Sequence, residues 1–487
     1  MHLSMLNNDR FLPGMNHILC GKPPKSALVQ LKEKAEAFKD SSLSELSDLF
    51  SNLVPSKHLE AKARKKNSRT RTYSLNVTFW AFLSQVLSPQ GACLEAVRKV
   101  QSYCSENKLP IPSSRTASYS EARSRMPVED LNGIHKEIAK KAQGKVLEKQ
   151  RWIGHDVKVI DGTGITLEDT PENQKAFPQP STQSEGCGFP VMKVVACFCL
   201  ASGTLLKWVE TSLKRHESRI LKSFLSLFGA NDVVLADRGF TSYTNLSLIL
   251  ARGSNAVMRA HQMRKVDYRK GKRLGRCDQV VTWRKPQRQK GWTKAQWAAF
   301  PDTLEIRTAR IFINVKGFRV RQYDLVTTLL DADIYTVDEL AQLYFRRWAV
   351  ELYFRHIKTT MGMERLRCKT PDMVRKELLM FIIAYNLIRA LLQQAAHLHG
   401  KDADRLSFKA AVDTLRQFRA ALIATRGRPR LQQGIIDDML AVIASETVPL
   451  RIHRSEPRAV KRRPKGFQLL TKHRSKFKVS KSRKSSK

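Results

Sequence analysis

The sequence predicts an α/β protein in which a central mixed sheet is flanked by helices. The first observation is a run of three apolar, β-branched segments, Val157–Ile160, Val191–Leu200 and Leu205–Thr211. The second is the alternation of helix and strand that follows, over His216–Phe228, Asp232–Ala236, Ser242–Ala251 and Ala256–Ala260. Consecutive strands followed by strands that alternate with helices are typical of a sheet with both antiparallel and parallel neighbours.

The region before this sheet, residues 1–150, is predicted to be helical and to bind DNA. Helical pieces are expected at Ala27–Phe38 and Ser44–Leu53, and a basic run follows at Lys62–Lys66. An apolar segment, Phe79–Leu87, comes next.

A helix, a break and a second helix close this N-terminal region. Leu94–Tyr103 has helical spacing, and two prolines in Ser105–Pro112 end it. The second helix, Ser113–Arg125, bears three arginines, Arg115, Arg123 and Arg125. This arrangement is similar to a DNA-binding helical unit, and the alternative is that it only packs.

Downstream of residue 260 the chain becomes basic and strand-like, which indicates a β-rich insertion at about 261–320. Its expected strands are Val280–Trp283, Leu304–Ile313 and Phe318–Val320. Tyr323–Leu330 returns to strand character, and helices then continue to about residue 446. The expected domains are thus 1–150, 151–395 with the insertion, a helical region at 396–450 and a basic tail at 451–487.

The net charge requires a polyanionic partner. The 487 residues carry 86 Lys and Arg against 44 Asp and Glu, a formal charge of +42. Nucleic acid held through its phosphates is the expected partner. The tail Arg451–Lys487 has Glu456 as its one acid, so we interpret it as an arm that follows phosphate or, alternatively, as a solubilising tail.

Neither a disulfide framework nor a membrane span is indicated. The eight cysteines show no paired spacing, which favours buried thiols in a reducing cytoplasm. The longest apolar stretch, Leu378–Leu392, is interrupted by Tyr385, Asn386 and Arg389. It is too short and too polar to cross a bilayer, so we expect a core helix and no membrane partner.

One predicted helix carries an unusual polar stripe. Thr336–Glu339 forms a capping box that begins it. One face then presents one acid, two bases and two aromatics, at Tyr344, Arg347, Trp348, Glu351 and Lys358. The opposite face, with Phe345, Ala349, Leu352 and Tyr353, is expected to pack on the core. Such a stripe suits an anionic ligand that also needs a metal.

Two aspartates are expected at strand ends near this stripe. Asp161 follows Val157–Ile160, and Asp237 follows Asp232–Ala236. Acids at such ends point into the crevice where ligands bind. Together with Glu351 they form an oxygen donor set suited to Mg²⁺ or Mn²⁺, with two ions expected. Glu168 and Asp169 are nearby rivals for the metal role.

The spacing Tyr344-x2-Arg347-x3-Glu351-x6-Lys358 resembles the YREK signature of IS4-family insertion-sequence transposases, a branch of the DDE transposases. Asp161-Gly162-Thr163 and Ala236–Phe240 are similar to the family's two aspartate motifs. Leu366–Pro371 and Tyr385–Arg389 also resemble family sequence, so the likeness covers about residues 150–395. It implies an RNase H-like fold, with the β-rich insertion between the second Asp and the Glu.

The resemblance also implies a DNA transposase that moves an insertion sequence by cut-and-paste. Asp161, Asp237 and Glu351 are then the catalytic residues and the metal ligands. The implied DNA contacts are Tyr344, Arg347, Trp348, Lys358 and Arg238. Water would nick the strand at the element's end, and the freed 3′-hydroxyl would then attack in strand transfer.

The partners implied are the terminal inverted repeats of the element and target DNA, bound by at least a dimer. The host compartment implied is a bacterial cytoplasm, in association with the nucleoid. The resemblance further implies a hairpin on the transposon end, which needs an aromatic platform for an extruded base. Candidate platforms are Trp348 and the insertion residues Trp283, Trp292 and Trp297.

Two other functions stay open from the sequence. One is a non-catalytic DNA-binding regulator of transposition, which the presence of all three acids disfavours. The other is a structure-selective nuclease on the same fold, which would need neither the basic arms nor specific ends.

Overall fold

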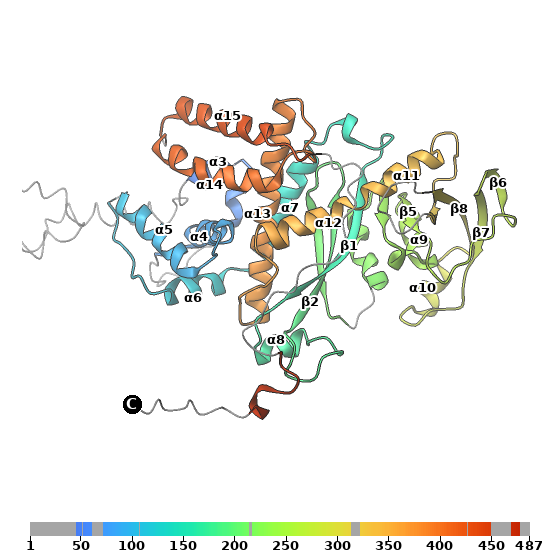
Figure 1. Cartoon of the computed structure of the whole chain (residues 1–487), viewed down its shortest axis with the longest axis horizontal. Coiled ribbons are helices and arrows are strands. Elements are labelled where there is room, and N and C mark those ends of the chain that lie inside the picture. The colour runs from blue at the N-terminus through green and yellow to red at the C-terminus, as the bar shows by residue number, and fades with distance from the viewer. Residues whose placement is uncertain are drawn as a thin grey trace, which may run out of the picture. The chain divides into compact units, whose positions relative to one another are not determined.

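The computed structural model describes residues 45–50, 52–60, 72–106, 108–213, 217–312, 322–425, 427–449 and 469–477 (Figure 1). The expected helix Ala27–Phe38, the basic run Lys62–Lys66, the strand Phe318–Val320 and most of the basic tail lie outside these residues. The chain forms two compact units. One is built around a sheet, mainly from residues 145–355, and the other is helical, from residues up to 144, 356–363 and 375–448.

The sheet unit contains one nine-stranded mixed sheet in the order β3-β2-β1-β4-β5-β9-β8-β7-β6. Its first five strands are β1 (Val157–Thr166), β2 (Val191–Cys199), β3 (Leu205–Thr211), β4 (Val233–Ala236) and β5 (Asn255–Arg259). β1, β2 and β3 are antiparallel neighbours, whereas β4 pairs parallel to β1, and β5 pairs parallel to β4. Three antiparallel strands followed by two parallel ones, with β1 in the centre, form an RNase H-like core, as predicted.

The β-rich insertion continues this same sheet. Its strands are β6 (Lys272–Gly275), β7 (Asp278–Arg284) and β8 (Thr303–Phe312), and β9 (Gln322–Thr327) joins them antiparallel to β5. Figure 1 shows this extension beside β5 and α9 (Tyr243–Leu250). The short helix α10 (Lys294–Ala298), which begins at a capping box of Thr293 and Gln296, was not predicted.

A buried ion pair fixes the extension to the chain that precedes the signature helix. Arg307 on β8 is fully buried and donates to both Asp278 oxygens, at 2.9 and 2.7 Å. The same guanidinium donates to the backbone carbonyls of Asp331 and Tyr335, at 3.1 and 2.6 Å. One side chain therefore joins β7, β8 and the segment that leads into the signature helix.

The remaining elements of the sheet unit are helices and short turns. They are α8 (Pro171–Ala176), η3 (Glu148–Gln150), η4 (Glu217–Leu227), η5 (Arg238–Phe240), α11 (Val337–Arg346), α12 (Ala349–Arg355) and η7 (Arg474–Lys476). The segment after β3, expected to be helical over His216–Phe228, is the 3-10 helix η4. Thr336 caps α11 by accepting from the Glu339 N–H at 3.2 Å, as the sequence predicts.

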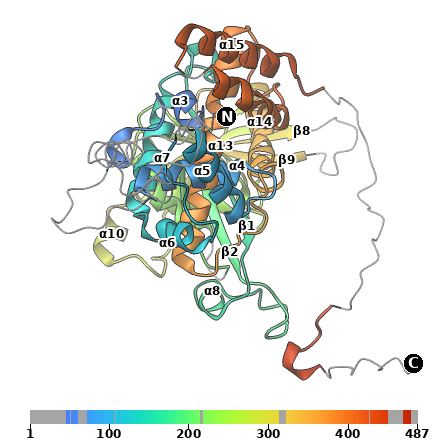
Figure 2. The same cartoon turned by 90° about the vertical axis from the view of Figure 1, so that its left-hand side faces the viewer.

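The helical unit packs several amphipathic helices on one long apolar helix. Its elements are α3 (Glu45–Phe50), η2 (Ser56–His58), α4 (Leu75–Leu87), α5 (Cys93–Glu106), α6 (Ala117–Arg125), α7 (Val128–Gln143), η6 (His356–Thr360), most of α13 (Pro371–Leu398), α14 (Phe408–Ala424) and α15 (Pro429–Ser445). Figures 1 and 2 both show α14 and α15 side by side. Among the described residues, α13 is the one helix long and apolar enough to cross a membrane, and its apolar window is 83% buried within the protein. It is therefore a core helix, as expected.

The predicted DNA-binding helix turns out to be partly a packing element. Arg123 on α6 is buried, with its guanidinium 4.9 Å from the Phe82 ring centre and 5.1 Å from that of Tyr119. Arg115 and Arg125 are exposed. Of the three arginines of this predicted unit, two face solvent and one supports the core.

We predict that Asp278→Ala strongly destabilises the sheet unit. The substitution leaves the Arg307 charge buried without its carboxylate, which costs about 3–5 kcal/mol. Urea unfolding of the full chain measures the shift. Asp267→Ala is the matched control, because its partner Arg269 is 89% exposed and the midpoint should barely move. Equal midpoints for the two variants would contradict the anchoring role of the buried pair.

Candidate active site

Strand register brings the two predicted aspartates together. Ile160 on β1 pairs with Ala236 on β4, and Ala236 pairs with Met258 on β5. Asp161 and Asp237 therefore lie directly beyond the last parallel pair of their strands. Neighbouring strands are about 4.8 Å apart, so the two backbones hold these carboxylates side by side.

The prediction that Asp161 ends its strand is wrong. β1 continues to Thr166 because residues 161–166 keep pairing with β2, with Asp161 opposite Ala196. The parallel ladder with β4 is what ends at residue 160. Asp161 thus lies on a continuing strand, which fixes its backbone more firmly than a loop would.

Each of the two carboxylates accepts a hydrogen bond from the backbone N–H of the residue that follows it. The Gly162 N–H donates to Asp161 Oδ1 at 2.8 Å, and the Arg238 N–H donates to Asp237 Oδ1 at 2.7 Å. Both side chains are half-buried. In each residue, one oxygen is thereby fixed by the backbone, which orients the carboxylate.

The signature helix is not one continuous helix, contrary to prediction. α11 ends at Arg346, a turn covers Arg347 and Trp348, and α12 runs over Ala349–Arg355 before the π-helical turn η6. Through the turn, N–H groups donate three residues back, as from Glu351 to the Trp348 carbonyl at 3.1 Å. Tightened and widened helical turns are frequent where a helix serves a functional site.

This irregularity changes which side chains face inward. Tyr344, expected on the polar stripe, is 2% exposed, whereas Leu352, expected in the core, is 44% exposed. Tyr353 is buried as expected. A constant helical period therefore misassigned Tyr344 before the break and Leu352 after it, and Arg347 at the break is buried as well.

Arg347 links the helix to the sheet. Its Nη1 donates to Asp161 Oδ2 at 3.2 Å, and its Nη2 lies 3.7 Å from Glu351 Oε1. Burial disfavours the charged guanidinium, but Tyr344 and the carboxylates of Asp161, Asp237 and Glu351 hold the pKa of Arg347 above its usual value. The structure thus brings Asp161, Asp237, Arg347 and Glu351 into one electrostatic cluster.

Two tyrosine rings and a second arginine lie next to this cluster. The Tyr344 ring meets Tyr323 on β9 edge to face, with centroids 5.3 Å apart. The Arg259 guanidinium lies 5.2 Å from the Tyr323 centroid. Burial, and to a smaller extent Asp237, raises the pKa of Tyr344 well above its usual range, although Arg347 opposes this.

Arg259 is a site residue that the sequence reasoning missed. It follows Met258 on β5 just as Asp237 follows Ala236 on β4, so it occupies the same register position one strand further along. Its carbonyl oxygen accepts from Thr241 Oγ1 at 2.7 Å. The sequence shows a basic residue near the end of a predicted strand. It does not show the register of that strand, which is what places Arg259 level with Asp237.

The other predicted contact residues lie on exposed or separate elements. Trp348 is 42% exposed, and Arg238 is exposed. Lys358 lies on η6, which belongs to the helical unit. The rival acids have other partners: Glu168 pairs with Arg365 at 3.1 Å, and Asp169 accepts from Gln174 at 2.8 Å.

The three predicted ligands are chemically suited to a hard divalent cation. Asp161, Asp237 and Glu351 supply the carboxylate oxygens that Mg²⁺ and Mn²⁺ prefer. Within the described ranges, no group of three or more His, Cys, Asp or Glu side chains is close enough to hold a metal ion. Arg347 instead supplies the positive charge between Asp161 and Glu351.

The chain is similar to known transposases over most of its length. A family model described as "Transposase DDE domain" matches residues 152–387, which span both aspartates and the signature helix. "Transposase InsG for insertion sequence element IS4" of Escherichia coli (strain K12) is 27% identical over 402 residues, covering 81% of this chain and 87% of that protein. A probable transposase for insertion sequence element IS5377 of Geobacillus stearothermophilus is 23% identical over 49% of this chain and 57% of its own length.

A solved structure, a piggyBac transposase synaptic complex with hairpin DNA, covers 87% of both chains at 10% identity with a TM-score of 0.40.

The RNase H-like core and the paired aspartates, together with the domain match, define a DDE transposase, an enzyme class that cleaves DNA with the help of divalent metal ions. Within that class, the chain belongs to the IS4 family, which confirms the resemblance drawn from the signature.

We predict that Tyr344 stays protonated up to at least pH 10. Its raised pKa keeps the phenol neutral. In an alkaline titration followed at 295 nm, the absorbance change near pH 10 should therefore be the same in Tyr344→Phe as in the unsubstituted protein. Loss of a transition near pH 10 in Tyr344→Phe would show that the ring is solvated.

Proposed function

We propose that this transposase moves its insertion sequence by cut-and-paste, through phosphodiester hydrolysis and strand transfer at terminal inverted repeats. The observation that carries the proposal is the shared register of Asp161 and Asp237, with Arg347 joining Asp161 to Glu351 on the signature helix. Two aspartates at one register position, with a cation that pairs with one of them and with Glu351, are suited to phosphodiester chemistry.

Asp161, Asp237 and Glu351 would hold two Mg²⁺ ions, or Mn²⁺ in their place. When bound, such ions activate an attacking oxygen and stabilise a leaving one. The protein's own part is to fix the donors. The backbone N–H groups of Gly162 and Arg238 orient the aspartates, and the tightened turn before α12 sets the position of Glu351.

Arg347 is assigned two successive partners. Without DNA it neutralises Asp161 and Glu351, and with DNA its planar fork binds a phosphate beside the scissile bond. Because the Arg347 pKa is raised, this charge is constant over the pH range of any assay. Tyr344 is assigned to hold Arg347 in place, since its ring lies 5.8 Å from the guanidinium and is buried.

The remaining contacts follow from exposure and charge. Arg238, Arg259 and Lys358 are assigned to backbone phosphates, and Trp348 to a base or sugar face. The N-terminal helices, with Arg115 and Arg125 exposed, are assigned to the terminal repeats. Two ends must be joined, so we propose at least a dimer on DNA, which also binds target DNA and acts in a bacterial cytoplasm at the nucleoid.

We also propose the hairpin route for cutting the second strand. In it, the freed 3′-hydroxyl attacks the opposite strand, and water later opens the hairpin. Of the candidate aromatic platforms, Trp283 and Trp297 are 6% and 9% exposed, whereas Trp348 is 42% exposed and Trp292 is half-buried. A platform ring must be accessible to the extruded base, so we favour Trp348 and Trp292 as platforms.

Two alternatives are less well supported. A non-catalytic regulator would not need Asp161 and Asp237 at the same register position on adjacent strands. It would also not need Arg347 paired with Asp161. A structure-selective nuclease would use the same carboxylates, and it is distinguished by strand transfer, which it would not perform.

The proposal predicts that Asp161→Ala, Asp237→Ala and Glu351→Ala each abolish strand cleavage and leave end binding largely intact. Metal ligands act in the chemical step, whereas affinity comes from the many basic residues. Cleavage of an end-labelled duplex in Mg²⁺ and a gel shift without divalent ions measure the two properties. Asp169→Ala is the matched control and should cleave normally. Near-normal cleavage by any of the three alanine variants would remove that residue from the catalytic set.

The hairpin route predicts a transient species of about double strand length on a denaturing gel. Arg347→Ala and Lys358→Ala should slow its formation more than they slow the first nick, because hairpin formation needs a distorted, phosphate-rich end. Double-strand breaks that appear without this species at any time point, even with hairpin opening slowed, would exclude the route.

A further inference from the structure

The register of the first three strands places a tryptophan on the same face of the sheet as Asp161, which we call the catalytic face. Asp161 on β1 pairs with Ala196 on β2, and Ala196 pairs with Trp208 on the edge strand β3. Residues that pair directly on antiparallel neighbours have their side chains on the same face of the sheet. Strands are about 4.8 Å apart, so the Trp208 backbone lies about 10 Å from that of Asp161, along one row that crosses the sheet.

Small side chains separate Trp208 from the catalytic aspartate. The residue between them on β2 is Ala196, which is buried and ends in a methyl group. In the next row of the same face, Thr163 pairs with Val194, and Val194 pairs with Glu210. Trp208 itself is half-buried, so part of it is accessible. The sheet surface beside the aspartate is therefore low, and an accessible aromatic ring stands at its far end.

The signature helix packs on the preceding row of the catalytic face. Val159 on β1 pairs with Phe198 on β2. The Phe198 ring centre lies 5.4 Å from that of Tyr353 and 5.3 Å from that of Phe354, both on α12. α12 also contacts β1 directly (Figure 1). The helix that carries Glu351 therefore lies on the catalytic face, one row away from Trp208.

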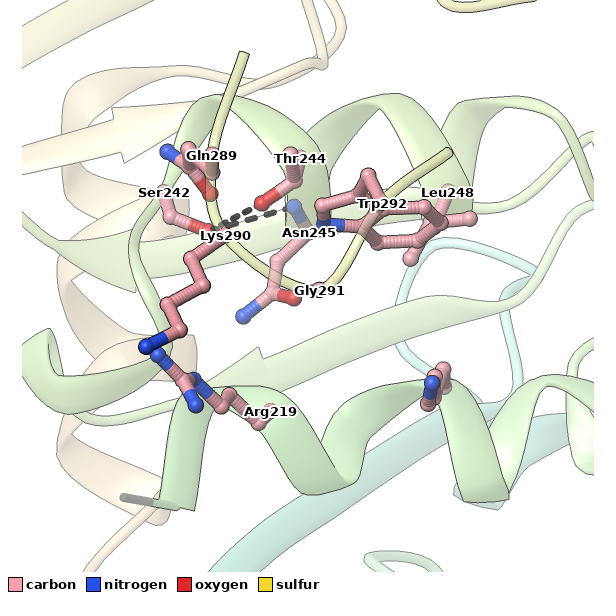
Figure 3. Close-up of a pocket in the computed structure, with 10 residues that line it drawn as sticks. Arg219, Ser242, Thr244, Asn245, Leu248, Gln289, Lys290, Gly291 and Trp292 are labelled. Carbon is pink, nitrogen blue, oxygen red and sulfur yellow. Dashed lines mark hydrogen bonds between the residues drawn. The ribbon is translucent and has the colours of Figure 1, made fainter. Parts of the chain in front are cut away.

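The opposite face of β3 is occupied by η4. Lys207 precedes Trp208 on the strand, and its Nζ donates to the Ser223 carbonyl and, at 3.3 Å, to Ser226 Oγ, both on η4. η4 also contacts α9, and with the insertion loop after β7 they enclose a polar cavity of about 540 Å³ (Figure 3). Successive side chains of a strand point to opposite faces, so the contacts of Lys207 agree with the assignment of Trp208 to the catalytic face.

The chemistry at this end of the row suits a base or a sugar. On β3, the catalytic face presents Trp208 and Glu210, and neither side chain attracts a phosphate. An indole ring offers a large apolar surface that packs on a nucleotide of any sequence. Arg259, a cation of the site, lies on β5, on the other side of Asp161 in the sheet order. Phosphate binding and aromatic packing are thus placed on opposite sides of the catalytic aspartate.

We propose that Trp208 is a further DNA contact, which positions the strand that passes Asp161 by packing on the base and sugar of one nucleotide. This inference rests on the proposed transposition. A row of about 10 Å corresponds to about three nucleotides, at about 3.4 Å per nucleotide along one strand. A contact at this distance from the scissile phosphate fixes the direction of the strand across β2, which the carboxylates alone leave free.

The first measurement is binding of full-length variants to an end-sequence duplex at several salt concentrations without divalent ions. Trp208→Ala should weaken binding about fivefold to a hundredfold, the usual effect of removing one stacking aromatic residue. The slope of log affinity against log salt should stay unchanged, because the contact is not ionic. Trp208→Phe should retain most of the affinity. Val209→Ala is the matched control, because Val209 is also half-buried on β3 but points to the other face.

A second measurement uses duplexes that each lack one base within three positions of the scissile phosphate. One of these duplexes should bind the unsubstituted protein more weakly, and the same missing base should cost Trp208→Ala nothing further. Such non-additivity identifies groups in contact, whereas a general loss of stability in the variant would weaken the binding of every duplex alike.

The inference is overturned if Trp208→Ala binds every duplex as Val209→Ala does, or if its effect adds fully to that of each missing base. A failed catalytic assignment is seen elsewhere, as cleavage by Asp161→Ala, and leaves these binding measurements unchanged. If the unsubstituted protein does not bind the end-sequence duplex, the proposed function falls, and this inference falls with it.

Discussion

The active site depends on a register that forces two negative charges together. The parallel ladders of β1, β4 and β5 end at the same level, which places Asp161 and Asp237 on adjacent strands about 4.8 Å apart. The sheet core is apolar and buried, so this register is fixed by packing far from the charges. The nearby Arg347 guanidinium lowers the repulsion between the carboxylates, since it donates to Asp161 and interacts electrostatically with Asp237.

The break in the signature helix follows from the same requirement. Arg347 has to reach Asp161 on the sheet while its own chain presents Glu351 one turn later. The turn at Arg347 and Trp348, with its three-residue hydrogen bonds, brings both side chains toward the sheet and turns Leu352 outward. The exposed Leu352 and Trp348 are thus consequences of orienting the charges, and they leave an apolar surface beside them.

The sequence predicted the residue types of the site better than its geometry. Strand-like segments and the Tyr344–Lys358 spacing were enough to identify the fold, and the grouping of the three acids stays a prediction. Register was not readable, so Arg259 was missed, although it continues the row formed by Asp161 and Asp237. A regular helical period also failed at Tyr344 and Leu352, because the competing ion pairs of Arg347 override local propensity. Burial of Arg123 was likewise hidden, since its partner Phe82 lies on another helix and is distant in sequence, although its second partner, Tyr119, is one turn away on α6.

The insertion is a continuous extension of the catalytic sheet. β9 pairs with β5, and Arg307 fixes β7 and β8 to the segment before α11. Movement of the signature helix relative to the insertion would expose the buried charge of Arg307, so the two must move together. The two strands that flank the loop carrying Trp292 are thus joined, through Arg307, to the segment that leads into the signature helix.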